Sequence, residues 1–166
     1  MVKKNNVHHN LDELESLFNQ TSKQSLLIFY SKLSLLELCG WIEETMDGII
    51  KAYTTKYISH PKNIKWSDDV VKYTYSFEYD KFKKMVVTLV GLRKTEIIES
   101  RLDASGDLPI LKSTLGNLKT KRDSFAHTFT KRGTTTTLYG PSSVKGDFTR
   151  LYKTLRQYEI QLMKMK

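Results

Sequence analysis

The sequence has few of the residues that mark several common classes of protein. Its 166 residues include one cysteine, three prolines and eight glycines. A single cysteine excludes an internal disulfide and a cysteine-rich zinc site. The scarcity of proline and glycine argues against a low-complexity or disordered chain. The first ten residues are polar and lack the apolar core of a secretory signal.

The chain also lacks a long uninterrupted apolar run. Its longest apolar-rich stretch, residues 26–50, is broken by charged side chains at Lys32, Glu37, Glu43, Glu44 and Asp47. Placing these charges inside a bilayer is costly, so we expect no membrane span and a cytoplasmic location. Cys39 lies within this stretch, and we expect a buried, unreactive thiol there.

Basic residues outnumber acidic ones. The chain has 27 lysines and arginines against 18 aspartates and glutamates, a formal charge of +9. This excess favours an anionic partner, most often nucleic acid, although plain solubility explains it as well. The chain is 39% hydrophobic, enough for a core, and its length fits a single domain over residues 1–166.

Apolar residues recur mostly at helical spacing, which predicts an all-α bundle of about five helices. The expected helices follow Asn10, run from Thr21 or Ser22 to about Tyr57, span 81–102, extend from Pro109 to about Arg132, and begin again at Pro141. In the second helix the apolar stripe that we expect to face the core is formed by Leu26, Phe29, Leu33, Leu36 and Gly40.

Residues 70–79 interrupt the helical pattern. From Lys72 to Tyr79 aromatic and polar side chains alternate strictly, which predicts a short extended or β insertion. Such a strand would pair with 134–139 or lie extended over the helices. Its aromatic row is suited either to half-buried packing or to stacking on nucleic-acid bases.

A charged residue interrupts the apolar stripe of the fourth helix. The stripe has steps of three and four residues and consists of Leu111, Leu115, Leu118, Arg122 and Phe125. A charge in such a slot must be paired or lie at an interface, because burying it alone is too costly. A functional arginine and a structural ion pair both satisfy this requirement.

The residues after Arg122 add acid–base chemistry. Asp123 and His127 are four residues apart, so they share a helix face, and the aspartate would raise the pKa of the imidazole. Arginine binds phosphate and histidine transfers protons near neutral pH. Arg122 and His127 are separated by about 140° around an ideal helix. Either the helix loosens there, or two copies of the chain combine to form one site.

Several charged residues surround this pair in sequence or in the expected bundle. Lys119, Lys121, Lys131 and Arg132 flank it and are suited to holding a nucleic-acid backbone, although each equally suits a solvated helix face. On the second helix we expect one or more acidic residues to face the pair, with Glu43, Glu44 and Asp47 as the candidates.

The segment Arg122-Asp123-x-x-Ala126-His127 resembles the R-x4-6-H signature of the HEPN superfamily. The histidine is followed by a polar turn, here Thr128, and the segment lies near the end of the penultimate helix, as in that family. Residues 38–53, with Gly40-Trp41-Ile42-Glu43-Glu44, look like the long helix of the HEPN subgroup named after RiboL-PSP proteins. The resemblance covers most of the chain in outline, and only the six-residue segment is sharply defined.

The resemblance implies a metal-independent endoribonuclease, a toxin or antiviral defence effector, that needs no cofactor. Arg122 would clamp the scissile phosphate, and His127 would act as general base or acid. Asp123 would orient one of them. The ribose 2′-OH would attack, leaving a 2′,3′-cyclic phosphate and a 5′-hydroxyl. The implied partners are a second copy of the chain, an RNA substrate and an antitoxin or other regulatory protein.

Two other functions remain open from the sequence. One is a non-catalytic HEPN-like module that binds nucleic acid or a partner protein. The other is a structural helical scaffold in which Arg122 and Asp123 form only an interface ion pair.

Overall fold

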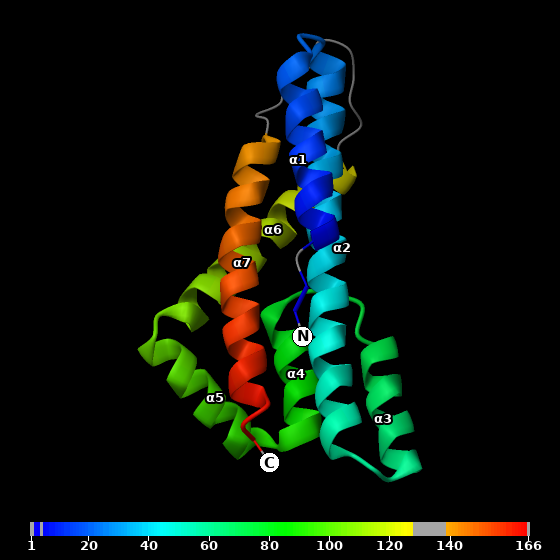
Figure 1. Cartoon of the computed structure of the whole chain (residues 1–166), viewed down its shortest axis with the longest axis vertical. Coiled ribbons are helices and arrows are strands. Elements are labelled where there is room, and N and C mark those ends of the chain that lie inside the picture. Colours follow the sequence, from blue (N-terminus) through cyan, green and yellow to red (C-terminus); the bar gives the residue numbers. More distant parts are fainter. Residues whose placement is uncertain (1, 4, 128–138, 166) are drawn as a thin grey trace.

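Seven helices form the regular structure of the part of the chain that the computed structural model describes, residues 2–3, 5–127 and 139–165 (Figure 1). The chain is all-α, as its periodicity predicts. The helices are α1 (Asn5–Gln20), α2 (Gln24–Tyr57), α3 (Pro61–Lys72), α4 (Tyr79–Val90), α5 (Leu92–Ala104), α6 (Asp107–His127) and α7 (Pro141–Leu162).

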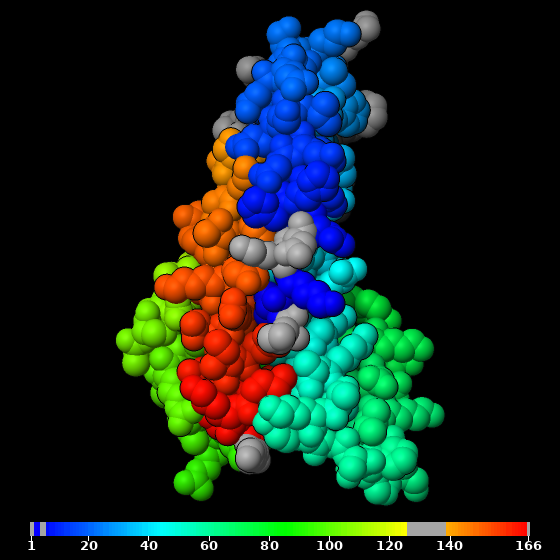
Figure 2. All heavy atoms as spheres, in the orientation of Figure 1, coloured from blue at the N-terminus to red at the C-terminus, as the bar shows by residue number. Residues whose placement is uncertain are grey.

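The long helix α2 organises the bundle. Its N-terminal half packs beside α1, and α7 lies against both of them (Figure 1). Its C-terminal half contacts α3 and α4, while α5 packs on α4, α6 and α7. The hairpin of α1 and α2 forms the narrow upper end of the molecule, and the shorter helices widen the opposite end (Figure 2).

One hydrophobic cluster contains side chains from all seven helices. Periodicity predicts one apolar face for the last helix, formed by Phe148, Leu151, Tyr152, Leu155, Tyr158 and Leu162. On α7 all of these side chains are buried except Tyr152, which is partly buried. Helix α7 also begins at Pro141, as predicted, because proline suits the first turn of a helix. The single-domain prediction is not tested by this cluster and stays a prediction.

Most of the stripe that we expected to face the core from α2 is instead exposed, and only Leu26 of that stripe is partly buried. Phe29, Leu33 and Leu36 retain between 45% and 59% of their accessible surface. The buried face of the same half of α2 contains Ile28, Ser31, Ser34, Leu35 and Leu38. This half of α2 is apolar on more than one side, so periodicity identifies the helix without selecting the face that packs.

The predicted extended or β insertion near 70–79 is wrong in its first part. Residues 61–72 form helix α3, which begins at Pro61, and only residues 73–78 are extended or irregular. No strand occurs in the described ranges, and most of the proposed pairing segment 134–139 lies outside them. The aromatic side chains do not share one face, as a regular strand would require: Phe77 and Tyr79 are buried, whereas Tyr73 and Tyr75 are exposed.

The helix expected over 81–102 is divided into two helices, α4 and α5. This division and the additional helix α3 account for the difference between the five helices predicted and the seven found in the described residues. Gly91 separates α4 from α5 with φ 79° and ψ 164°, a conformation almost restricted to glycine. A glycine within an apolar periodic pattern is compatible with either a continuous or a broken helix. Helix α1 also begins earlier than predicted, at Asn5, and the side chain of Asn10 donates to Glu37 instead of capping.

Helix α2 is long and apolar enough to cross a membrane by length and composition. The core helices of soluble proteins meet the same criterion, and α2 packs against α1, α3, α4, α6 and α7. The expectation that it does not span a membrane stays a prediction.

Candidate functional site

Arg122 lies where the buried face of α6 meets solvent. Leu111, Leu115 and Leu118 are buried on this face, and Arg122, one turn after Leu118, is 32% exposed. The apolar stripe of the sequence is therefore confirmed up to the arginine. The guanidinium is neither fully buried nor free in solvent, which makes it accessible to a ligand while its stem still packs on the protein.

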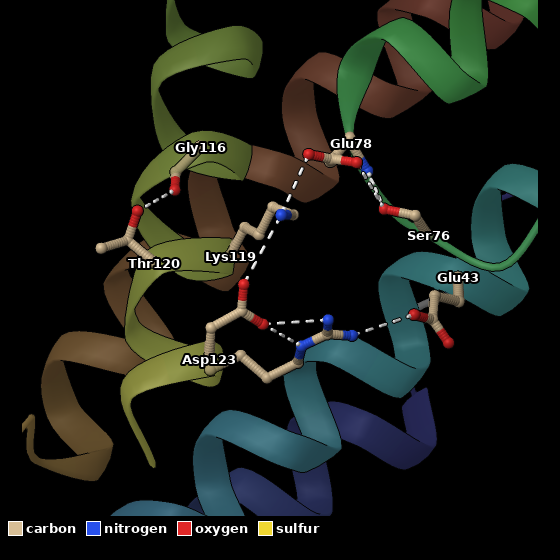
Figure 3. Close-up of polar contacts among 8 residues, drawn as sticks. Glu43, Ser76, Glu78, Gly116, Lys119, Thr120 and Asp123 are labelled. Atoms are coloured by element: carbon tan, nitrogen blue, oxygen red, sulfur yellow. Dashed lines mark hydrogen bonds and ion pairs between the residues drawn. The ribbon is translucent and has the colours of Figure 1, made fainter. Parts of the chain in front are cut away.

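Three side chains hold the guanidinium of Arg122. Its Nε and Nη2 both donate to Oδ1 of Asp123, at 3.2 Å and 3.1 Å. Its Nη1 lies 3.8 Å from Oε1 of Glu43 on α2, an ion-pair distance that is too long for a hydrogen bond (Figure 3). The guanidinium carbon lies 5.3 Å from the ring centre of Phe77. Arg122 is thus oriented by Asp123 and Phe77, and Nη1 is its least engaged nitrogen among the described residues.

Lys119 extends this arrangement along α6. Its ammonium lies 3.2 Å from Oε1 of Glu78 and 3.5 Å from Oδ2 of Asp123 (Figure 3). The hydroxyl of Ser76 donates to Glu78 and accepts from its backbone N–H. We call Glu43, Glu78, Lys119, Arg122 and Asp123 the α6 cluster. It joins α2, α6 and the 73–78 segment through two cations and three carboxylates.

Hydrogen bonds within the α6 cluster favour the charged forms of its members. The bond from Arg122 lowers the pKa of Asp123, and the bond from Lys119 lowers the pKa of Glu78. In return, Glu78 raises the pKa of Lys119. All three groups therefore stay ionised near neutral pH.

The other basic residues predicted to hold RNA are only partly described. Lys121 places its ammonium 3.4 Å from the ring centre of Tyr139, whose hydroxyl donates to Asp147 on α7. Lys131, Arg132 and Thr128 lie outside the described residues. His127 is the last residue of α6, and its side chain is likewise outside them, so its expected contact with Asp123 stays a prediction.

The three acidic candidates on α2 point to different surroundings. Glu43 faces Arg122, as expected for one member of this set. Asp47, one turn later, lines a cavity with Glu43 and residues 74–76. Glu44 is exposed and lines a separate hollow beside Trp41 and Gly48. Of these three residues, Glu43 belongs to the α6 cluster and Asp47 lies in the cavity beside that cluster. Glu44 lies in neither the cluster nor the cavity.

Sequence reasoning missed two contributions from the segment before α4. Phe77 lies beneath the guanidinium of Arg122, and Glu78 pairs with Lys119. The alternating aromatic row left packing and base stacking both open for Phe77, and it could not show what this ring packs against. Residues about forty positions apart meet here only through the tertiary fold.

Cys39 is close to this region and is buried, as predicted. Burial raises the pKa of its thiol to about 12, against a smaller opposite effect of Arg122. A neutral thiol is a poor nucleophile, so Cys39 is a packing residue.

Among the described residues no group of three or more histidine, cysteine, aspartate or glutamate side chains is placed to hold a metal ion. Comparison of the chain with protein-family models, curated proteins and solved structures found no match.

Proposed function

We propose that the protein is a metal-independent endoribonuclease of the HEPN type. The observation that carries the proposal is the state of Arg122: a half-exposed guanidinium, oriented by Asp123 and Phe77, on the helix whose last residue is His127. The resemblance of residues 122–127 to the HEPN signature supports the same function, as does the net charge of +9.

In this proposal Arg122 binds the scissile phosphate, and its contacts support that role. Asp123 occupies Nε and Nη2, whereas Nη1 has only the 3.8 Å approach of Glu43. A scissile phosphate would take over the Nη1 side, and the guanidinium would stabilise the charge that builds up in the transition state. Asp123 thereby serves as the positioning residue of Arg122.

His127 supplies the proton transfers in this proposal. As general base it would take the proton of the ribose 2′-OH, whose oxygen attacks phosphorus. The bond to the 5′-oxygen then breaks, and that oxygen takes up a proton. The products would be a 2′,3′-cyclic phosphate and a 5′-hydroxyl, and DNA, which lacks the 2′-OH, would resist cleavage.

A second copy of the chain completes the proposed site. Helix α6 remains helical up to His127, so positions 122 and 127 lie about 140° apart around its axis on one chain. The exposed stripe of Phe29, Leu33 and Leu36 lies on α2 between the tip of the bundle and Glu43. In the proposed dimer a second copy covers this stripe and the two α6 ends come together, so that the arginine and the histidine come from different protomers.

Cleavage of single-stranded RNA in the presence of EDTA tests the proposed ribonuclease. Arg122→Ala and His127→Ala should each abolish cleavage and leave the circular dichroism spectrum unchanged. Arg156→Ala and His60→Ala are matched controls, because both side chains are exposed and lie outside the α6 cluster. Undiminished cleavage by both Arg122→Ala and His127→Ala would contradict the proposal.

The composite site has a separate test. Leu36→Lys places a charge on the exposed stripe, so it should convert a dimer into a monomer in light scattering and reduce cleavage with it. Its unfolding transition should stay close to that of the wild type, because Leu36 is 54% exposed. A variant that is monomeric and fully active would refute the two-copy site.

The charge balance of the α6 cluster favours one alternative, a non-catalytic module that binds nucleic acid or a partner protein. Three carboxylates face two cations there, so an incoming phosphate must compete with Glu43. This module would bind RNA with a strong dependence on salt and would not cleave it under any condition.

A further inference from the structure

A cavity of about 310 Å³ lies beside the α6 cluster, between α2 and the segment that precedes α4. Its size is at the lower end of the range of roughly 300–1,000 Å³ usual for small-molecule sites. It is lined by Glu43 and Asp47 of α2, by Lys72 of α3, and by Thr74, Tyr75 and Ser76 of the segment before α4, and apolar side chains complete its wall. The cavity therefore combines two acidic residues, one lysine, hydroxyl groups and an aromatic ring.

The carboxylate of Asp47 is an unused acceptor in this cavity. It makes no hydrogen bond or ion pair with any residue of the described ranges, although it is partly buried. Burial raises its pKa, with Lys51 acting in the opposite direction. A partly desolvated carboxylate gains most from a ligand that offers N–H donors to both of its oxygens.

Tyr75 provides an aromatic surface at the edge of the same cavity. It is 79% exposed, whereas Phe77 and Tyr79 of the same alternating row are buried. A large ring left open beside a polar cavity is suited to stacking on a flat partner. The two interpretations of the aromatic row thus apply to different members: Phe77 and Tyr79 pack, and Tyr75 remains available.

The cavity and Arg122 are joined by one side chain. Glu43 lines the cavity, and its Oε1 lies 3.8 Å from Nη1 of Arg122 (Figure 3). The side chain of Glu43 would therefore be the group between a ligand in the cavity and the guanidinium of Arg122. This neighbourhood fits a nucleotide, in which a flat base with N–H donors is tethered to a phosphate.

We infer that this cavity binds one unpaired base of a single-stranded RNA and prefers guanine, with Asp47 reading the base edge and Tyr75 stacking on its face. Guanine offers two adjacent donors, at N1 and N2, which match the two oxygens of a carboxylate. Uracil offers one N–H between two carbonyl oxygens, which a carboxylate repels. The inference deepens the proposed ribonuclease function and rests on it for the choice of RNA as ligand.

Binding of short RNAs to the His127→Ala protein tests the cavity without cleavage. The probes are two fluorescent single-stranded hexanucleotides, one all uridine and one with a single central guanosine. The guanosine probe should bind about tenfold tighter in fluorescence anisotropy. Adding Asp47→Asn should bring the ratio close to one, because the amide presents a donor to the base edge.

Tyr75 variants and an acidic control separate the cavity from general effects. Tyr75→Ala should weaken binding of the guanosine probe by about five- to tenfold, within the range measured for lost base stacking. Tyr75→Phe retains the ring and should bind like the parent. Glu44→Gln removes a neighbouring charge outside the cavity and should leave the guanosine preference unchanged. Equal binding of both probes, or a preference that survives Asp47→Asn and Tyr75→Ala, would overturn the inference. Absence of any RNA binding would overturn it as well and favour a protein partner.

Cleavage of the same probes by the wild-type protein distinguishes the two proposals. Guanosine-selective binding that depends on Asp47, without cleavage, would support the base cavity and contradict the ribonuclease. Cleavage at equal rates in both probes, unchanged by Asp47→Asn, would support the ribonuclease and contradict the base cavity.

Discussion

Replacement of Arg122 by alanine separates a functional arginine from a structural one. The structure indicates that the substitution costs little stability. A cation–π contact at a solvent-accessible site, such as that with Phe77, contributes about 0.5–1 kcal/mol. A half-exposed ion pair, such as that with Glu43, contributes about 0.2–1 kcal/mol. We therefore expect Arg122→Ala to lower the free energy of unfolding by about 1–2 kcal/mol.

Urea denaturation followed by circular dichroism measures this change. A chain of this length loses about 2–4 °C in Tm for each kcal/mol, so the melting temperature should fall by about 2–8 °C. Leu118→Ala is the matched control, because Leu118 lies one turn earlier on the same face of α6 and is fully buried. Truncation of a buried leucine costs about 2–5 kcal/mol.

The two variants should therefore show opposite effects on stability and on RNA cleavage. Arg122→Ala should be folded and inactive in RNA cleavage, whereas Leu118→Ala should be less stable but active while it remains folded. A loss of stability in Arg122→Ala as large as that in Leu118→Ala would refute the reasoning and identify Arg122 as a structural residue.

Three further predictions follow from other contacts. A hydrogen bond from Lys145 lowers the pKa of Glu15. The ionised carboxylate therefore stabilises the fold above its ordinary pKa of 4.5, and this stabilisation is lost as pH falls through the lower pKa of the folded state. Lys145→Met should accordingly destabilise the protein at pH 7 and much less at pH 3, as measured by thermal unfolding. Cys39, with its thiol pKa raised to about 12, should not react with a thiol reagent at pH 8 in the native protein and should react fully in urea; rapid native labelling would show that the site opens. Gly91→Ala should lower stability by about 1–3 kcal/mol, because φ is 79° there. Gly116→Ala, at an exposed position within helix α6, should raise stability by up to about 1 kcal/mol, and similar effects of both substitutions would contradict the backbone argument.

Much of the helical architecture could be predicted from the sequence. Proline placement agrees with the end of α2 before Pro61 and with the start of α7 at Pro141. Apolar periodicity agrees with the buried face of α7. These features depend on interactions between residues a few positions apart. Proline geometry and a clear division into apolar and polar faces are properties of the local chain.

The face that α2 buries could not be predicted in the same way. Phe29 and Leu36 looked like core residues and are exposed, while Ser31 is fully buried. A helix that is apolar on more than one side satisfies the pattern with either face inward. The choice depends on the shapes of α1 and α7, which periodicity does not contain.

The candidate site shows the same division. The sequence by itself determined that a charged residue, Arg122, interrupts an apolar stripe. It predicted that one or more of three acids of α2 would face this arginine, and in the structure Glu43 lies beside it. Only the tertiary structure placed Phe77 under the guanidinium, Glu78 on Lys119, and Asp47 beside Tyr75 in one cavity. The physical reason is distance along the chain. Helical spacing decides which residues share a face, whereas contacts between separate elements depend on how those elements pack.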